Sequence, residues 1–179
     1  GGTIVVYPSS KSSIVSNKNT IIGNTVLYGA TSGKLFASGQ AGERFAVRNS
    51  GGFSIVEGCG AHGCEYMTGG SAIILGEVGD NFGAGMTGGM AFVYDEKNTF
   101  ENFANPASII WQEVETDYWK KFLKESLNDF VQETNSKIAK KILDSFNSEL
   151  KKFKQICPIE MLDKLENPIS LKSRVKKAS

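Results

Sequence analysis

The sequence is poor in histidine, in long apolar runs and in net charge. His62 is the only histidine among 179 residues, so imidazole can supply no more than one ligand to a metal. No apolar run reaches membrane-spanning length, and no basic and apolar leader opens the chain, so we expect no membrane contact and no secretion. The net charge of +1 predicts no electrostatic attraction to nucleic acid or to an anionic membrane.

Cysteine is also scarce. The chain has 3 cysteines, an odd number that favours free thiols in a reducing compartment over a disulfide framework. We therefore expect a cytoplasmic location.

Glycine is absent from the last 90 residues, because all 20 glycines lie at or before Gly89. Lysine, arginine and acidic residues concentrate after this point. The composition changes between residues 95 and 108, which predicts two regions, 1–98 and 99–179.

Four glycine pairs precede short apolar runs in the first region. They are Gly1-Gly2, Gly51-Gly52, Gly69-Gly70 and Gly88-Gly89, and a fifth run follows Gly33. From Gly33 to the second glycine of each later pair, the steps are 19, 18 and 19 residues. Self-similarity at this period predicts a solenoid with coils of 18–19 residues.

Aligning the runs on their glycines gives two neighbouring columns that are wholly apolar. One column is Val5, Phe36, Ile55, Ile73 and Phe92, and the next is Val6, Ala37, Val56, Ile74 and Val93. Successive residues of a strand point to opposite faces, so both faces of the predicted sheet are buried. One face fills the solenoid, and the other needs a cover, which is either the tail of this chain or another domain.

A second apolar segment precedes the glycines of each coil, at residues 26–28, 45–47 and 66–68. It predicts at least two strand-length pieces in each coil, joined by glycine-rich turns. The step from Gly2 to Gly33 is about a dozen residues longer than one coil, and we place the extra residues in a loop within the polar stretch 9–20.

The second region has helical periodicity. Apolar residues at spacings of three and four predict a helix over 117–133, with Thr116 as its N-cap. The same pattern predicts a second helix from the cap Asn135 or Ser136 to about Gln155, forming a hairpin with the first. Residues 109–114 favour a short strand before the hairpin. A solvated end is expected for the last basic residues, Lys172, Arg174, Lys176 and Lys177.

Two stretches match the G-x-G-x-x-G pattern of dinucleotide-binding loops. Residues 58–63 follow an apolar strand, with Asp80 at a suitable distance for a ribose contact, and residues 83–88 match again. The chemistry needs a helix after the third glycine, so that its N-terminal amides hold the pyrophosphate. Here residues 64–70 end in a glycine pair and Gly88 leads into a strand, so both matches are predicted to be repeat corners.

Cys59, His62 and Cys64 cluster within six residues, but they leave a closed zinc site one ligand short. A thiolate nucleophile beside His62 would need orienting groups that a glycine-rich turn rarely supplies. Charged residues recur at the corners and are expected to form structural ion pairs more readily than a general acid and base. These residues are Glu43, Arg44, Arg48, Glu57 and Glu65. We therefore assign no catalytic, cofactor-binding or metal-binding residue.

The sequence does not meet the repeat requirements of two other solenoid types. A hexapeptide helix needs an aliphatic residue at every sixth position, but the sixth residues after Ile22 are Tyr28 and Lys34. Calcium-binding nonapeptide repeats need an aspartate in each unit, and only Asp80 and Asp95 lie in this region.

Four segments carry a resemblance to a known family. They are IGNTVLYGAT at 22–31, AGERFAVRNSG at 41–51, GCEYMTGG at 63–70 and NFGAGMTGG at 81–89. Across about residues 1–95 the chain resembles the GXGXG family, the carboxy-terminal domain of glutamate synthase large (alpha) chains, and the tail resembles that of the bacterial enzyme more loosely. The family commonly has aspartate where this chain has Ala61.

The resemblance implies a right-handed parallel β-helix inside a multidomain oxidoreductase. In that family an amidotransferase domain releases ammonia from L-glutamine, and a flavin barrel uses it with 2-oxoglutarate and a reduced donor to make L-glutamate. The resemblance places FMN, an iron–sulfur cluster and both active sites in other domains. Those domains, and a small electron-transfer subunit, are the implied partners. The β-helix is then a scaffold with no catalytic activity of its own.

Two alternatives stay open at this point. One is a GXGXG subunit or domain of another enzyme such as formylmethanofuran dehydrogenase, and the other is a free-standing protein-interaction module. The register adds an expectation, because Gly1-Gly2 occupies the position that closes later coils. It predicts that the chain starts inside a coil, as a piece of a longer protein truncated at its N-terminal end. The residues give no indication of the electron donor.

Overall fold

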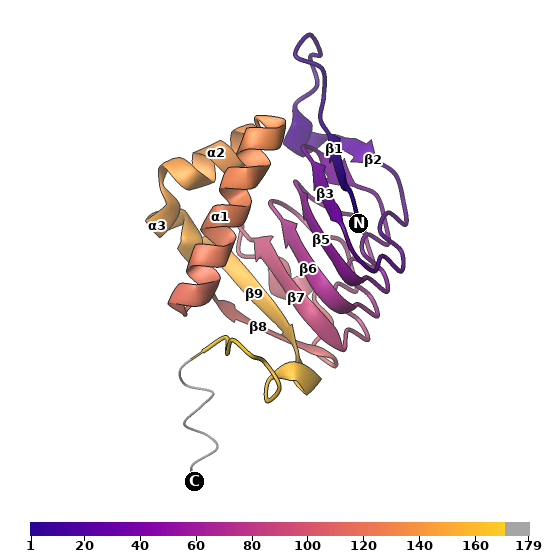
Figure 1. Ribbon diagram of the computed structural model, residues 1–179, viewed down its shortest axis with the longest axis vertical. Helices are drawn as coiled ribbons and strands as arrows, with labels where there is room; N and C mark the ends of the chain where they lie inside the picture. Colours follow the sequence, from indigo (N-terminus) through magenta and orange to yellow (C-terminus); the bar gives the residue numbers. More distant parts are fainter. Residues whose placement is uncertain (171–179) are drawn as a thin grey trace.

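The main feature of the described structure is a seven-stranded sheet, whose labelled strands lie side by side in Figure 1. A computed structural model describes residues 1–170, and the expected basic end at 172–177 lies outside them. The strand order is β1-β3-β5-β6-β7-β9-β8. The strands are β1 (Thr3–Val6), β3 (Lys34–Ala37), β5 (Ser50–Val56), β6 (Thr68–Ile74), β7 (Gly88–Tyr94), β8 (Ile109–Glu113) and β9 (Phe153–Pro158). The first five are parallel, and β9 runs antiparallel to both β7 and β8.

A small second sheet, three helices and four 3-10 turns complete the described fold. A two-stranded parallel sheet joins β2 (Thr20–Ile22) to β4 (Gln40–Ala41). The α-helices are α1 (Asp117–Thr134), α2 (Lys137–Asp144) and α3 (Phe146–Glu149). The 3-10 turns are η1 (Ser16–Lys18), η2 (Phe100–Asn102), η3 (Leu150–Lys152) and η4 (Ile159–Met161). The described chain is thus mostly β, with a solenoid-like parallel sheet and three helices packed beside it. None of these helices is long and apolar enough to cross a membrane.

The register of the parallel strands confirms the two apolar columns. Val5 pairs with Phe36, Phe36 with Ile55, Ile55 with Ile73 and Ile73 with Phe92. The neighbouring column follows in the same register. Each coil therefore stacks on the previous one in the way that the glycine alignment predicts.

The two faces of the sheet belong to two separate cores. Ala37, Val56, Ile74 and Val93 face the interior of the solenoid, where Phe45, Met67 and Phe82 are fully buried. Phe36, Ile55, Ile73 and Phe92 face outward and pack against Leu123, Leu127 and Phe130 of α1. Figure 1 shows α1 lying across this outer face. Of the two covers that the sequence allowed, the outer face meets the tail of this chain.

A second hydrogen-bonded ladder runs along the turns. Every second residue there has a positive φ, and the positions stack from coil to coil. One column is Thr25, Arg44, His62 and Asn81, and the next is Leu27, Ala46, Cys64 and Gly83. The amides alternate in direction, since Arg44 N donates to Ala61 of the following coil (2.8 Å) and Ala46 N to Val26 of the preceding coil (2.9 Å). These bonds offset a left-handed conformation that costs a non-glycine residue about 1–2 kcal/mol.

This ladder corrects the expectation of strand-length pieces in the turns. Residues 26–28 and 45–47 are turns, and β6 begins only at Thr68, so residues 66–68 do not form a strand of their own. The apolar pattern misled because Phe45 and Met67 belong to the inner core, as residues of a strand would. The expected loop at 9–20 is confirmed; it is largely exposed and ends where β2 begins.

The tail confirms the first helix and corrects the second. Helix α1 starts after Thr116 and spans Asp117–Thr134, and β8 confirms the short strand expected at 109–114. Ser136 is the N-cap of α2, its side chain accepting from Ala139 N. The second helix does not reach Gln155, because α2 ends at Asp144 and residues 153–158 form β9. Strand β9 pairs with the edge of β7 and so satisfies backbone groups that a helix would leave open.

Candidate functional site

The cysteines that looked like possible nucleophiles lie inside the solenoid. Cys59 and Cys64 belong to the inner core, at 7% and 0% exposure. Burial raises the pKa of the Cys59 thiol to about 12, and burial followed by the nearby Cys59 raises the pKa of Cys64 well above its ordinary value. Both groups therefore stay protonated near neutral pH, and the reactive thiolate is disfavoured.

His62 does not join them. Its Nδ1 lies 2.7 Å from Oε1 of Glu65, three residues along the same corner, and its side chain is 35% exposed. Across the described residues, no group of three or more histidine, cysteine, aspartate or glutamate side chains is arranged to hold a metal. The sequence cluster is thus divided between an interior and a surface.

The two glycine motifs are corners of the coil, as the sequence predicts. In the first, the Cys59 amide donates to Glu77 and the His62 amide to Asp80, both in the following coil. In the second, the Gly83 amide donates to Gly63 and the Gly85 amide to Oγ of Ser108. Amides that already serve neighbouring segments cannot also hold a pyrophosphate.

The charged corner residues form fewer ion pairs than expected. Over the described part of the chain, Glu65 pairs with His62, while Arg44 and Arg48 are exposed and have no carboxylate within ion-pair distance. Glu57 behaves differently from the others, because it is completely buried.

Glu57 stands at the carboxyl end of β5, where two regions of the molecule meet. Its Oε1 accepts a hydrogen bond from Ser38 Oγ in the preceding coil (2.9 Å) and another from Ser136 Oγ at the start of α2 (2.6 Å). Ser136 also caps α2, so one hydroxyl joins the helix to the solenoid. The carboxylate is thus a polar joint between segments 79 residues apart in sequence.

A cavity of about 720 Å³ lies beside this joint, at the carboxyl ends of the parallel strands. Its wall includes Glu57 and Leu75 from the strand ends, Tyr94 from β7 and Ile138 from α2. Carboxyl ends of parallel strands are a common place for ligands in open sheets, which makes this the strongest candidate site in the described structure.

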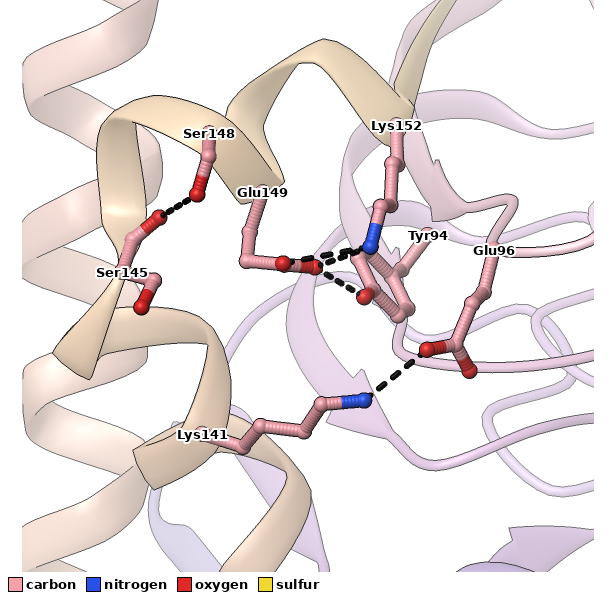
Figure 2. A network of polar contacts seen from close by, with 7 residues as sticks. All are labelled: Tyr94, Glu96, Lys141, Ser145, Ser148, Glu149 and Lys152. Carbon is pink, nitrogen blue, oxygen red and sulfur yellow. Dashed lines mark hydrogen bonds and ion pairs between the residues drawn. The ribbon is translucent and has the colours of Figure 1, made fainter.

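A polar network borders the cavity where the tail meets the end of β7 (Figure 2). The Tyr94 hydroxyl donates to Glu149, which also accepts from Lys152 at 2.9 Å. Next to it, Lys141 of α2 pairs with Glu96 at 2.8 Å. The hydrogen bond from Tyr94, followed by that from Lys152, lowers the pKa of Glu149, while burial and then Glu149 raise the pKa of Tyr94. The network attaches α2, α3 and η3 to the solenoid.

A family model described as the GXGXG motif matches residues 1–159. The chain belongs to the GXGXG family. The match extends past β9, so it includes the helices and the strand that complete the sheet as well as the parallel coils.

The GXGXG chain is also similar to curated glutamate synthases. It is 57% identical over 171 residues to the glutamate synthase (NADPH) large chain of Azospirillum brasilense, covering 96% of this chain and 11% of that protein. It is 50% identical over 158 residues to the ferredoxin-dependent glutamate synthase of Antithamnion sp., covering 88% and 10%. It is 44% identical over 177 residues to the glutamate synthase (NADH) of Schizosaccharomyces pombe, covering 99% and 8%.

The GXGXG chain thus spans about a tenth of the length of these relatives. These similarities confirm the resemblance to glutamate synthase large chains. They do not favour a subunit of formylmethanofuran dehydrogenase or a free-standing interaction module.

Sequence reasoning considered Glu57 only as one of several corner charges and missed its partners. Ser38 and Glu57 align in one column at the strand ends, but the column also holds Tyr7, Leu75 and Tyr94, and this mixture of polar and apolar residues gave no signal of a buried bond. Ser136 was predicted as one of two possible helix caps, the other being Asn135, but nothing in the sequence links it to Glu57. Tyr94 and Glu149, 55 residues apart, also carried no signal of their contact.

Proposed function

We propose that this chain is a structural, non-catalytic domain of a glutamate synthase. The domain is a right-handed parallel β-helix with coils of 18–19 residues, followed by a helical hairpin tail. Its parent enzyme makes L-glutamate from L-glutamine and 2-oxoglutarate with a reduced electron donor. FMN and an iron–sulfur cluster are bound by other domains of the parent chain, and this domain is a spacer and packing platform for them.

The observation that carries the proposal is where the reactive groups lie. Cys59 and Cys64 are buried in the inner core with raised pKa values, so a nucleophilic role is unfavourable. The corner amides that resemble a nucleotide loop donate to neighbouring coils and to Ser108. Chemistry-bearing residues therefore contribute to the stacking of coils, which is the expected pattern for a scaffold.

We infer that the rest of the parent enzyme contacts the β1 end of the solenoid. Large apolar side chains are exposed there: Ile4 on the first strand (60% exposed), Tyr7 just after it (57%), and Ile14 and Val15 in the adjoining loop (49% and 54%). Within the described sheet, β1 pairs only with β3, so its other edge presents free backbone groups. An exposed apolar patch beside an open strand edge favours burial against another domain.

The proposal also covers the choice of electron donor and the cellular location of the parent enzyme. The relatives are named for NADPH, ferredoxin and NADH, yet the chain is 57%, 50% and 44% identical to them, so we place the choice of electron donor outside this domain. The three cysteines are free and buried, which fits a cytoplasmic parent enzyme.

The test compares two sets of substitutions in a full-length glutamate synthase that carries this segment. His62→Asn and Cys59→Ala change the groups that look most catalytic, and asparagine tolerates the positive φ of 65° at His62. We expect kcat/KM for glutamine-dependent synthesis to stay within about twofold per folded molecule. Ile4→Lys should instead reduce the yield of assembled enzyme, because it places a charge at the proposed domain contact.

A tenfold loss of kcat in folded His62→Asn or Cys59→Ala enzyme would show that the domain takes part in the chemistry. Glutaminase turnover or bound FMN in the purified 179-residue chain would equally contradict the scaffold proposal.

A further inference from the structure

One oxygen of the buried Glu57 carboxylate has no partner. Oε1 accepts from Ser38 and Ser136, whereas Oε2 is buried and has no hydrogen bond to any described residue. A buried carboxylate oxygen is costly unless a donor reaches it. Glu57 lies two residues beyond Ile55 and therefore on the outer side of the sheet, the same side as Leu75 and Tyr94. Glu57, Leu75 and Tyr94 all border the cavity.

The other carboxylates of the cavity wall are already engaged. Glu77 pairs with Lys97, Glu96 pairs with Lys141 at 2.8 Å, and Asp95 accepts from two backbone amides. Formally, four acidic residues and two lysines line the cavity, so it favours a positive ligand. Among these groups in the described structure, Glu57 is the one with a buried, unpartnered oxygen.

The rest of the wall is mixed, with apolar side chains beside uncharged polar ones such as Asn17, Gln40 and Asn102. Leu75, Val78, Val93, Phe100 and Ile138 are among its apolar residues, and a volume of about 720 Å³ is larger than a single ion requires. The described residues also offer no cluster of three acidic, histidine or cysteine side chains, which a divalent metal would need. The matching ligand therefore combines an apolar stem with one cationic N–H donor.

We propose that this cavity binds a primary ammonium group on an apolar stem, with Glu57 Oε2 as its hydrogen-bond acceptor. The stem contacts the apolar part of the wall, and the ammonium group donates to the oxygen that Ser38 and Ser136 leave free. Such a group occurs in a free alkylamine and in the side chain of a lysine from another protein segment. The proposal is independent of the scaffold role proposed above.

The first experiment varies the ligand and leaves the protein unchanged. The full 179-residue chain is titrated with n-butylammonium and followed by two-dimensional amide NMR. We expect shifts at residues around Glu57, Leu75 and Ile138, with a Kd on the order of 1 mM for so small a ligand. Neutral n-butanol should bind at least tenfold more weakly, and so should tetramethylammonium, which has the charge but no N–H donor. Equal binding of either analogue, or no saturable shift with n-butylammonium, would overturn the proposal.

The second experiment varies the protein. Glu57→Gln keeps the size and one acceptor oxygen but removes the charge, so n-butylammonium affinity should fall at least tenfold. The matched control is Glu77→Gln, which removes a charge from the same wall at a side chain that is 67% exposed and already paired. We expect the control to change affinity less than twofold, since an exposed paired charge is well screened. Similar losses in both variants would reduce the effect to general electrostatics and contradict a specific acceptor.

If Glu57→Gln fails to fold, a cavity-filling Ile138→Trp variant tests the same site from α2 and should also abolish the shifts. A titration with a Gly-Lys-Gly peptide that is blocked at both ends distinguishes the two sources of the ammonium group. Tighter binding of the peptide than of n-butylammonium assigns the site to a lysine side chain of a partner segment, and weaker binding assigns it to a free amine.

Discussion

The two faces of the parallel sheet are equally buried but are filled from different parts of the sequence. The inner face packs against turn residues such as Phe45 and Phe82, which lie within about one coil of the strands they touch. The outer face packs against α1, where Phe130 contacts Phe36 with ring centroids 5.7 Å apart across more than ninety residues of chain. The repeat therefore builds one core from local neighbours, while the other core depends on a distant helix.

The largest effects come from removing one aromatic ring from each core. Phe45→Ala and Phe130→Ala both empty fully buried sites, and each should lower the free energy of unfolding by about 3–5 kcal/mol. We expect hydrogen exchange to distinguish them. Phe45→Ala should reduce amide protection in every coil, whereas Phe130→Ala should first expose the amides of α1 and leave β5 and β6 protected.

Urea unfolding gives the free energies, and exchange measured by mass spectrometry gives the location. Uniform loss of protection in Phe130→Ala would show that both cores unfold together and would remove the distinction between the faces.

The second effect concerns the joint between the two regions. Glu57→Ala leaves the hydroxyls of Ser38 and Ser136 without their acceptor and empties a buried position, so we expect a loss of about 2–4 kcal/mol. The control Glu77→Ala removes an exposed glutamate and should change stability by less than about 0.5 kcal/mol. Chemical denaturation measures the free energy of unfolding of both variants. An equal loss in the two would show that Glu57 does not join the solenoid to α2.

The same division explains what the sequence could predict. The columns through Val5 and Phe92 and the helix at 117–133 follow from short periods, since each residue's environment repeats nearby. Strand β9 was missed because Phe153 continues the helical spacing of Phe146 and Leu150. The segment forms a strand because it pairs with the open edge of β7. The spacing of apolar residues within a segment carries no information about a strand edge that lies about sixty residues away in the chain.

The polar contacts of the candidate site were missed for a related reason. Glu57 and Ser136 are 79 residues apart, and neither belongs to a motif that specifies the other. The positive φ angles were missed because seven of the eight positions in the two turn columns are not glycine, so no composition signal marks them. Their conformation is imposed by hydrogen bonds between coils, which exist only once the coils have stacked.

A third, smaller effect compares two helix caps in the tail. Ser136 bonds both Ala139 N and Glu57, whereas Thr116 stands at the N-cap of α1 without a side-chain bond to the helix. Ser136→Ala should cost about 1–2 kcal/mol, while Thr116→Ala should cost less than about 0.5 kcal/mol. Thermal and urea unfolding of both variants check this order. A larger loss in Thr116→Ala would place the main attachment of the tail at α1.

The smallest effect is a pH dependence of the network between Tyr94 and the tail. Hydrogen bonds from Tyr94 and Lys152 lower the folded-state pKa of Glu149, so they stabilise the fold above the ordinary glutamate pKa of about 4.3. This contribution is lost as the pH falls through the lowered pKa. Its size should stay below about 1 kcal/mol, because the Lys152 side chain is 38% exposed.

The acid arm of this prediction compares wild type with Glu149→Gln. Between pH 6 and pH 3 the unfolding free energy of the wild type should fall more steeply, since the other carboxylates titrate in both proteins. At the alkaline end the sign reverses: burial and Glu149 raise the pKa of Tyr94, so its neutral hydroxyl stabilises the fold below about pH 10, and this stability is lost as the pH rises toward the raised pKa. Tyr94→Phe should lack the alkaline loss. Parallel curves at both ends would mean that the contact between Tyr94 and Glu149 adds no stability, leaving the Glu57–Ser136 hydrogen bond and the Lys141–Glu96 pair as the polar attachments of α2 to the solenoid.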